Sequence, residues 1–209
     1  MLLSDIEISR LAQDGMISPY IGSLIREVDE RRTWQQDSRT ITSSGIRRVL
    51  SYGASSYGYD LRLSPKEFLI FRHVPGTVVD PKSFNPANLE PAPLHSDEQG
   101  EYFILPAHSY GLGVAMEHLS LPADVTALFI GKSTYARCGI IANLTPGEAN
   151  WKGHLTLEFS NSSGADARLY AGEGIVQALF FRGEPCTTTY HDRAGKYQNQ
   201  PESVTLARI

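Results

Sequence analysis

The sequence has few cysteines, no excess of basic charge and no long apolar run. Its only cysteines, Cys138 and Cys186, stand in no C-x-x-C pair or Cys/His ligand spacing, which argues against a disulfide framework and a zinc site. The net charge of −4 argues against a nucleic-acid polymer as partner, because general nucleic-acid binders carry a basic face. No stretch could span a bilayer, and residues 1–15 lack the basic start and apolar centre of a signal peptide. We therefore expect a soluble cytoplasmic protein with reduced cysteines and no membrane partner.

The N-terminal residues predict helices. Ser4 and Glu7 have the spacing of a capping box, and an apolar stripe follows as far as Gly15, so a first helix is expected there. Residues 21–30 predict a second short helix. Residues 31–46 are polar and aperiodic, which indicates a surface loop.

The chain after this loop predicts strands. Short apolar or alternating segments follow one another between residues 47 and 182, separated by Gly, Pro and Asn. Strands and helices do not alternate, so the pattern indicates an all-β barrel or sandwich rather than a Rossmann sheet. Residues 77–100, with several prolines, predict a long surface excursion. We expect one domain, 1–209, with a helical part (1–30), a β core (47–182) and a tail (186–209) that is either frayed or a lid over a ligand.

The stretch TALFIGKSTYARCG, residues 126–139, contains the Gly-Lys-Ser-Thr end of a Walker phosphate loop. That pattern needs a glycine five residues before Gly131, but the position holds Thr126 and an apolar strand follows, which argues against a Walker loop. What remains is a strand that turns into a short helix, with Lys132 and Arg137 beside two hydroxyls. Free N–H groups and two cations at this turn would attract an anionic oxygen. The alternative is an ordinary strand-ending turn with solvated charges.

The stretch GHLTLEFSN, residues 153–161, predicts a strand with two different faces. The apolar face belongs to the core and carries Leu155, Leu157 and Phe159. The other face carries Glu158 between Thr156 and Ser160. It is either a solvated strand surface or, if a cleft shields it, a place where Glu158 acts as general acid and base with a pKa raised by burial. Asp60 also lies in a predicted strand, where an isolated Asp is usually an ordinary hydrogen-bonding residue.

Five segments taken in order resemble the dCTP deaminase family of the dUTPase-like superfamily: YGYDLRL, GKSTYARCGIIANLTP, WKGHLTLEFSN, YAGEGIVQALFF and GKYQNQ. The resemblance covers residues 47–200. It implies a homotrimer of distorted β-barrel or jelly-roll subunits with short N-terminal helices and active sites between subunits. The implied reaction converts dCTP and water to dUTP and ammonia, supplying dUTP for thymidylate synthesis. It also implies Mg²⁺ on the triphosphate, no zinc and no protein metal ligand, with dTTP as a plausible inhibitor.

The resemblance also assigns site residues. It implies that Glu158 is the catalytic acid and base, helped by Ser133 and Arg137. The implied substrate-binding residues are Lys132, Ser133, Thr134, Tyr135, Ala136, Arg137, Glu148, Trp151, Thr156, Leu157, Glu158, Gln177, Tyr190, Lys196 and Gln200. Ser133 would position the water or the leaving amino group, and Arg137 would hold the carboxylate of Glu158 and tune its pKa. Because the sequence offers no zinc ligands, we expect Glu158 to activate the water as a general base, in a slow enzyme.

One position departs from the family pattern. Glu148 stands where many relatives, and dUTPases more strictly, have an aspartate that contacts the deoxyribose. The longer side chain argues against diphosphatase activity. Three alternatives nevertheless stay open: a bifunctional enzyme that gives dUMP and pyrophosphate, a dUTP diphosphatase, and an inactive nucleotide sensor. The resemblance assigns no role to residues 31–46, which look like an insertion.

Overall fold

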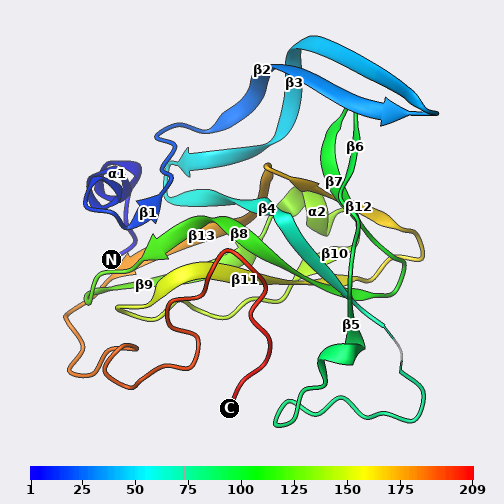
Figure 1. Cartoon of the computed structure of the whole chain (residues 1–209). Coiled ribbons are helices and arrows are strands. Elements are labelled where there is room, and N and C mark those ends of the chain that lie inside the picture. Colours follow the sequence, from blue (N-terminus) through cyan, green and yellow to red (C-terminus); the bar gives the residue numbers. More distant parts are fainter. Residues whose placement is uncertain (73) are drawn as a thin grey trace.

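The structure is a computed structural model that describes residues 1–72 and 74–209, and it is mainly β, as predicted (Figure 1). The elements are α1 (Asp5–Gln13), β1 (Ile17–Ser18), β2 (Ile25–Gln36), β3 (Arg39–Ser55), β4 (Gly58–Phe71), the 3₁₀ helix η1 (Pro86–Asn88), β5 (Leu89–Pro91), β6 (His95–Asp97), β7 (Gly100–Leu105), β8 (Tyr110–Ser120), β9 (Val125–Gly131), α2 (Ser133–Ala136), β10 (Ile140–Ala142), β11 (Lys152–Asn161), β12 (Ala167–Ala171) and β13 (Gly174–Arg182). The predicted capping box is confirmed, since Ser4 and Glu7 close the start of α1, and Gly15 with φ +91° follows its end.

Strand β4 connects the two halves of the distorted barrel, one that contains β3 and β13 and one that contains β8. Its first part, around Asp60, pairs with β13 and β3, whereas its last part, from Phe68 to Ile70, pairs with β8. The ladder with β8 is interrupted between Leu63 and Phe68. Pro65 lies in this interruption, and because proline has no N–H to donate, it is tolerated where a strand leaves one ladder for another. Residues on both sides of Pro65 thus belong to one bent strand.

The core fills the space between the two halves. Alternate residues of β9, and of β11 from Leu157 onward, point inward, as the period-two pattern predicts. Leu155, predicted on the same core face, is only half-buried, because the register of β11 shifts between His154 and Thr156. At the centre of the core the Phe68 ring stacks on Phe103 and Phe159 at centroid distances of 5.2 and 6.3 Å. These aromatic side chains bury large apolar areas, and burial of such area is the main stabilising contribution in a β fold of this size.

Two predictions about the N-terminal third were wrong. Residues 21–30 are not a helix and residues 31–46 are not a loop, because β2 and β3 pair along their length. Ile25 and Val28 fit a helical spacing, but half-buried and exposed residues alternate from Val28 onward, and that alternation has the period of a strand. Asp37 and Ser38 close the hairpin with φ of 48° and 64°, the left-handed backbone that a two-residue hairpin turn requires.

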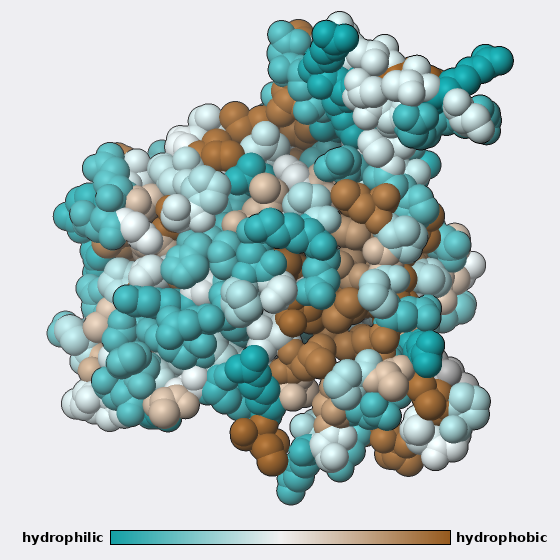
Figure 2. Space-filling view, in the orientation of Figure 1, coloured by the Kyte–Doolittle hydropathy of each residue, from teal (hydrophilic) through white to brown (hydrophobic). Residues whose placement is uncertain are grey.

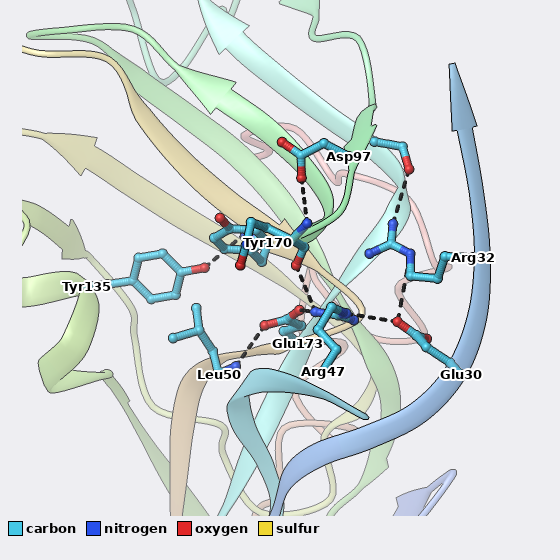
Figure 3. A network of polar contacts seen from close by, with 10 residues as sticks. Glu30, Arg32, Arg47, Leu50, Asp97, Tyr135, Tyr170 and Glu173 are labelled. Atoms are coloured by element: carbon cyan, nitrogen blue, oxygen red, sulfur yellow. Dashed lines mark hydrogen bonds and ion pairs between the residues drawn. The ribbon is translucent and has the colours of Figure 1, made fainter. Parts of the chain in front are cut away.

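We call residues 25–50 the arm, because they extend beyond the barrel as a twisted ribbon (Figure 1). A network of polar contacts attaches its base to the barrel (Figure 3). The buried Glu173, in the turn between β12 and β13, accepts a hydrogen bond from the backbone N–H of Leu50 at 2.7 Å and pairs with Arg47. Arg47 also donates to Glu30 across the hairpin at 2.8 Å. Charged groups thus fix the base of the arm, together with Leu50, which packs against the core.

Candidate active site

A cavity of about 720 Å³ lies over one face of β8 and β11. Apolar side chains gather there, between the C-terminal segment and the loop that leads into η1 and β5 (Figure 2). Seven residues implied by the family resemblance line the cavity: Glu148, Trp151, Thr156, Glu158, Tyr190, Lys196 and Gln200. They come from segments up to 52 positions apart in sequence, so the fold brings them together.

Glu158 projects from the cavity face of β11. Its neighbour across the ladder is Leu112 of β8, and both side chains line the cavity. Burial raises the pKa of the half-buried Glu158 carboxyl. Among the residues that the structure describes, no cationic side chain offsets this effect. The carboxyl is therefore easier to protonate than an exposed Glu, which suits a group that both takes and gives protons.

An aromatic wall explains this burial. The Phe71 ring meets the edges of Tyr110 and Phe84 at centroid distances of 5.3 and 6.0 Å, and all three side chains line the cavity. The pKa of Tyr110 is raised, first by burial and then by the nearby charge of Glu158. Aromatic rings on this side exclude water from the carboxylate, and such exclusion strengthens any electrostatic interaction that forms in the cavity.

The C-terminal tail covers another side of the cavity. Thr156 donates to the side-chain oxygen of Gln200 at 2.9 Å and accepts from the backbone N–H of Thr205 at 3.1 Å. Trp151 donates its indole N–H to the carbonyl of Tyr197 at 2.8 Å. Of the two alternatives left by the sequence, a frayed tail or a lid, the structure has the tail packed on the cavity. Its own side chains Tyr190 and Lys196 face the same space.

The tail is also attached at its far end. Glu202 accepts a hydrogen bond from Ser64 at 2.8 Å and pairs with Lys66, both of which lie in β4. Burial alone would raise the pKa of Glu202, but the hydrogen bonds from Lys66 and Ser64 outweigh it and lower the pKa. Glu67 accepts the backbone N–H of Val204 at 2.6 Å. These contacts hold the tail across the barrel.

The loop of residues 132–137 does not line this cavity. Lys132 and Tyr135 point into the protein, whereas Ser133, Thr134, Ala136 and Arg137 are exposed. Arg137 donates to the Ser133 hydroxyl at 3.3 Å. Within the described chain Arg137 makes no ion pair with Glu158, so the predicted contact between them does not occur inside one protomer.

Two further predicted residues lie elsewhere. The Leu157 side chain is buried in the core, so only its backbone can face the cavity. Gln177 lies in the middle of β13, between Asp60 of β4 and Ile130 of β9, outside the cavity lining. The carboxylate of Glu148 does line the cavity but pairs with Arg193 of the tail.

The chain was then compared with known proteins. A family model described as dCTP deaminase-like matches residues 31–183. The chain belongs to this family. It is 45% identical over 207 residues to a protein named dCTP deaminase from Acidovorax sp. (strain JS42), covering 98% of this chain and 97% of the relative. It is 44% identical over 208 residues to a dCTP deaminase from Dechloromonas aromatica (strain RCB), covering 99% and 98%.

A solved structure shares the fold of this dCTP deaminase-like chain. It is the 2'-deoxycytidine 5'-triphosphate deaminase from Agrobacterium tumefaciens, with a TM-score of 0.51 and 18% sequence identity. The match covers 87% of this chain and 48% of that one, so the chain spans about half the length of the solved structure. The resemblance seen in the sequence is confirmed at the level of family and fold.

Sequence reasoning missed several residues that shape the site of this family member. Tyr110 and Leu112 lie on β8, which pairs with β11. Phe71 ends β4, one strand farther in the sheet, and Phe84 lies in the loop before η1. The alternation in β8 could have placed Tyr110 and Leu112 on one face, but only the strand pairing shows that this face adjoins Glu158. Residues 1–72 and 74–209 contain no group of three His, Cys, Asp or Glu side chains placed to hold a metal. No helix in these ranges is long and apolar enough to cross a membrane.

Proposed function

We propose that the protein is a dCTP deaminase, which hydrolyses the C4 amino group of dCTP to give dUTP and ammonia. The observation that carries this proposal is the position of Glu158. Its carboxyl lies on a rigid strand in a cavity that aromatic rings and the tail shield, and burial raises its pKa. The relatives named dCTP deaminase support the choice of substrate.

In the mechanism, Glu158 removes a proton from a water as the water oxygen bonds to C4. The proton moves to the ring nitrogen N3, which neutralises the charge that builds there in the tetrahedral intermediate. The proton of the hydroxyl group now on C4 then passes through the carboxylate to the amino group, so that the C4–N bond breaks, ammonia leaves and a carbonyl forms at C4. A carboxyl with a raised pKa suits both directions of transfer, and such catalysis contributes roughly 10²–10⁴-fold.

The triphosphate would lie toward the tail. Lys196, Tyr190 and Gln200 line the same cavity as Glu158 and offer a cation and hydrogen-bonding groups. Mg²⁺ would be held through the phosphate oxygens of the nucleotide, because Mg²⁺ in nucleotide sites is commonly bound through substrate phosphates. When bound, the ion neutralises phosphate charge. Glu148 and Trp151 would contact the sugar, and the backbone at Thr156 and Leu157 the base.

A second copy of the chain would complete the site. The exposed Ser133 and Arg137 lie outside the cavity of their own protomer. The outer face of β9, directly before this loop, exposes two large apolar side chains, Leu128 and Ile130, each 39% exposed. Covering such a face with another copy would bury it and carry the loop to the neighbouring cavity. A homotrimer with shared sites would place Ser133 on the attacking water and Arg137 on the carboxylate of Glu158.

The contact of Glu148 favours a deaminase over a bifunctional enzyme. Its carboxylate pairs with Arg193, and a paired carboxylate is a poor base for attack of water on phosphate. Incubating the purified protein with dCTP and Mg²⁺ and separating the products tests the proposal. We expect dUTP and ammonia, which would feed thymidylate synthesis. Formation of dUMP and pyrophosphate would indicate the bifunctional reaction, and absence of turnover would refute both.

Inhibition by dTTP follows from the same site. Its base and triphosphate resemble those of the product, so the proposed site should bind it without a reaction at C4. Adding dTTP to the dCTP assay should lower the rate. A rate unchanged by dTTP at concentrations above the KM for dCTP would exclude this regulation.

A further inference from the structure

Buried contacts fix the start of the loop of residues 132–137. The ammonium group of Lys132 donates to the carbonyl oxygen and the hydroxyl of Ser51, at 2.8 and 3.0 Å, and pairs with the carboxylate of Asp60. The side chains of Lys132 and Asp60 are 12% and 5% exposed. Three strands therefore meet at this point: β3 through Ser51, β4 through Asp60, and the end of β9.

Burying this pair costs more than an apolar contact of the same size would. Asp60 has one carboxylate oxygen, Oδ1, that is buried and has no hydrogen-bond partner among the described residues. Removing two charges from water is expensive, and well-packed apolar residues are often as stable or more stable than a buried ion pair. The pair is therefore better explained by what it orients than by the stability that it adds.

The pair determines where the exposed residues of the loop point. Lys132 directly precedes α2, and its carbonyl accepts the N–H of Ala136 at 3.1 Å. Because α2 has only four residues, it cannot hold its own direction by internal hydrogen bonds. A second anchor is Tyr135, whose buried hydroxyl accepts the N–H of Tyr170 at 2.9 Å (Figure 3). The loop thus turns two anchoring side chains inward and presents Ser133 and Arg137 outward.

We propose that Asp60 is a positioning residue for deamination, which acts through Lys132 to aim Ser133 and Arg137 at the reacting base. This inference rests on the proposed function. In this proposal the ammonium group of Lys132 holds the loop through Ser51 and Asp60, which we call the anchor, and does not bind the triphosphate. Since a misplacement of about 1 Å can cost about a hundredfold in rate, loss of the anchor should lower kcat more than it raises KM.

The test is a double-mutant cycle on dCTP turnover with Asp60→Asn, Lys132→Met and the double variant. Each single change should lower kcat by about tenfold or more, with KM within about twofold of the wild type. The double variant should be no slower than the slower single variant, because both changes remove the same anchor. Additive losses would show that Asp60 and Lys132 act separately, and a rise in KM confined to Lys132→Met would indicate that Lys132 binds the triphosphate. Either result would overturn the proposal.

If the pair of Asp60 and Lys132 only stabilised the fold, an apolar replacement that folds would keep full activity, whereas a positioning pair would not be replaceable. Asp60→Leu combined with Lys132→Met replaces the pair by apolar side chains and leaves no buried charge, so this variant should fold even if Asp60→Asn does not. A folded apolar variant with wild-type kcat would contradict the proposal. Asp97→Asn serves as the matched control, because Asp97 pairs with Arg168 away from the loop, and its kcat should stay unchanged.

Hydrogen exchange tests the anchor without any nucleotide. The amides of Ala136, Arg137 and Cys138 are bonded within the loop in the wild type and should exchange faster in Asp60→Asn or in the apolar variant. If the wild type does not deaminate dCTP, the proposed function fails whatever the exchange shows. If it does, unchanged exchange in the loop, or faster exchange with unchanged kcat, overturns the inference about Asp60.

Discussion

Glu158 in β11 and Glu30 in the arm are both half-buried strand residues, yet their surroundings differ. Glu30 lies between Arg32 and Arg47, at 3.7 and 2.8 Å, so its charge is compensated. Glu158 lies opposite Leu112 beside an aromatic wall, and no described cation in its protomer compensates it. Strand geometry alone therefore does not make a carboxyl reactive. A compensated carboxylate holds two elements together, whereas an uncompensated one in a shielded cavity is ready for proton transfer.

The largest difference should appear between two variants, one in which Glu158 and one in which Glu30 is changed to Gln. Glu158→Gln should lower kcat for dCTP by at least ~10²–10⁴-fold, because the base is lost, while dCTP still binds. Glu30→Gln should leave kcat within about twofold, since it weakens only an arm contact. Ammonia release and calorimetric binding of dCTP measure both properties. Loss of activity in Glu30→Gln equal to that in Glu158→Gln would remove the distinction.

The pH dependence should report the shielding of Glu158. Because burial raises its pKa, the base form is lost at a higher pH than for an ordinary Glu, whose value is 4.5. In a plot of kcat/KM against pH, the midpoint of the decline on the acid side (the acid limb) should therefore lie above pH 4.5. Leu112→Asn admits water beside the carboxyl and should move the limb to lower pH, whereas the exposed Ile46→Asn in the arm should not. A limb at or below 4.5 in the wild type would contradict the expectation that burial, rather than the Arg137 proposed from a neighbouring copy, dominates this pKa.

The contacts of the tail should have a smaller effect. Glu202→Gln weakens the attachment to Lys66, a partly exposed ion pair of the kind that contributes up to about 1 kcal/mol, so KM for dCTP should rise by at most about fivefold. Since the pKa of Glu202 is lowered in the folded protein, this contribution is present above its ordinary pKa and is lost as the pH falls through the lowered value. Limited proteolysis should cleave the tail faster in the variant. A faster-cleaved tail with unchanged KM would show that the tail does not cover the nucleotide.

Shortening the arm should have the smallest effect. Replacing residues 31–44 by an Asn-Gly turn joins Glu30 to Gly45, which already face each other in the hairpin. The cavity lies elsewhere, so kcat/KM should change by less than about twofold, as expected for a surface extension. Steady-state assays of the shortened chain check this. A large loss of activity would mean that the arm belongs to the site, in its own or a neighbouring protomer.

The same contrast explains what could be predicted from the sequence. The period-two pattern of GHLTLEFSN placed Glu158 on the face opposite the core, and the structure agrees because β11 pairs on both sides within the barrel. The arm was missed because Glu30 and Arg32 interrupt the apolar residues Val28 and Trp34 on its more buried face. Burial therefore alternates along β2, but hydropathy does not. The turn at Asp37 and Ser38 lacks glycine, the usual mark of a tight hairpin.

The site was only partly predictable for a related reason. Family resemblance named Thr156, Glu158 and Gln200, which meet in the cavity. It could not show that Lys132 and Tyr135 turn inward while Ser133 and Arg137 turn out, because a loop of this length has no periodicity from which to infer direction. That arrangement depends on long-range contacts with Ser51, Asp60 and Tyr170.

A mixing experiment with two inactive variants tests most directly whether the site is shared between copies. Glu158→Gln keeps the loop, and Arg137→Gln keeps the carboxyl, so each alone should be nearly inactive. If the variants are unfolded together and refolded as mixed trimers at equal amounts, about a quarter of the sites should combine an intact Glu158 with an intact Arg137 from a neighbour, and about a quarter of wild-type activity should return. Mixed trimers that form but remain inactive would contradict a site shared between subunits.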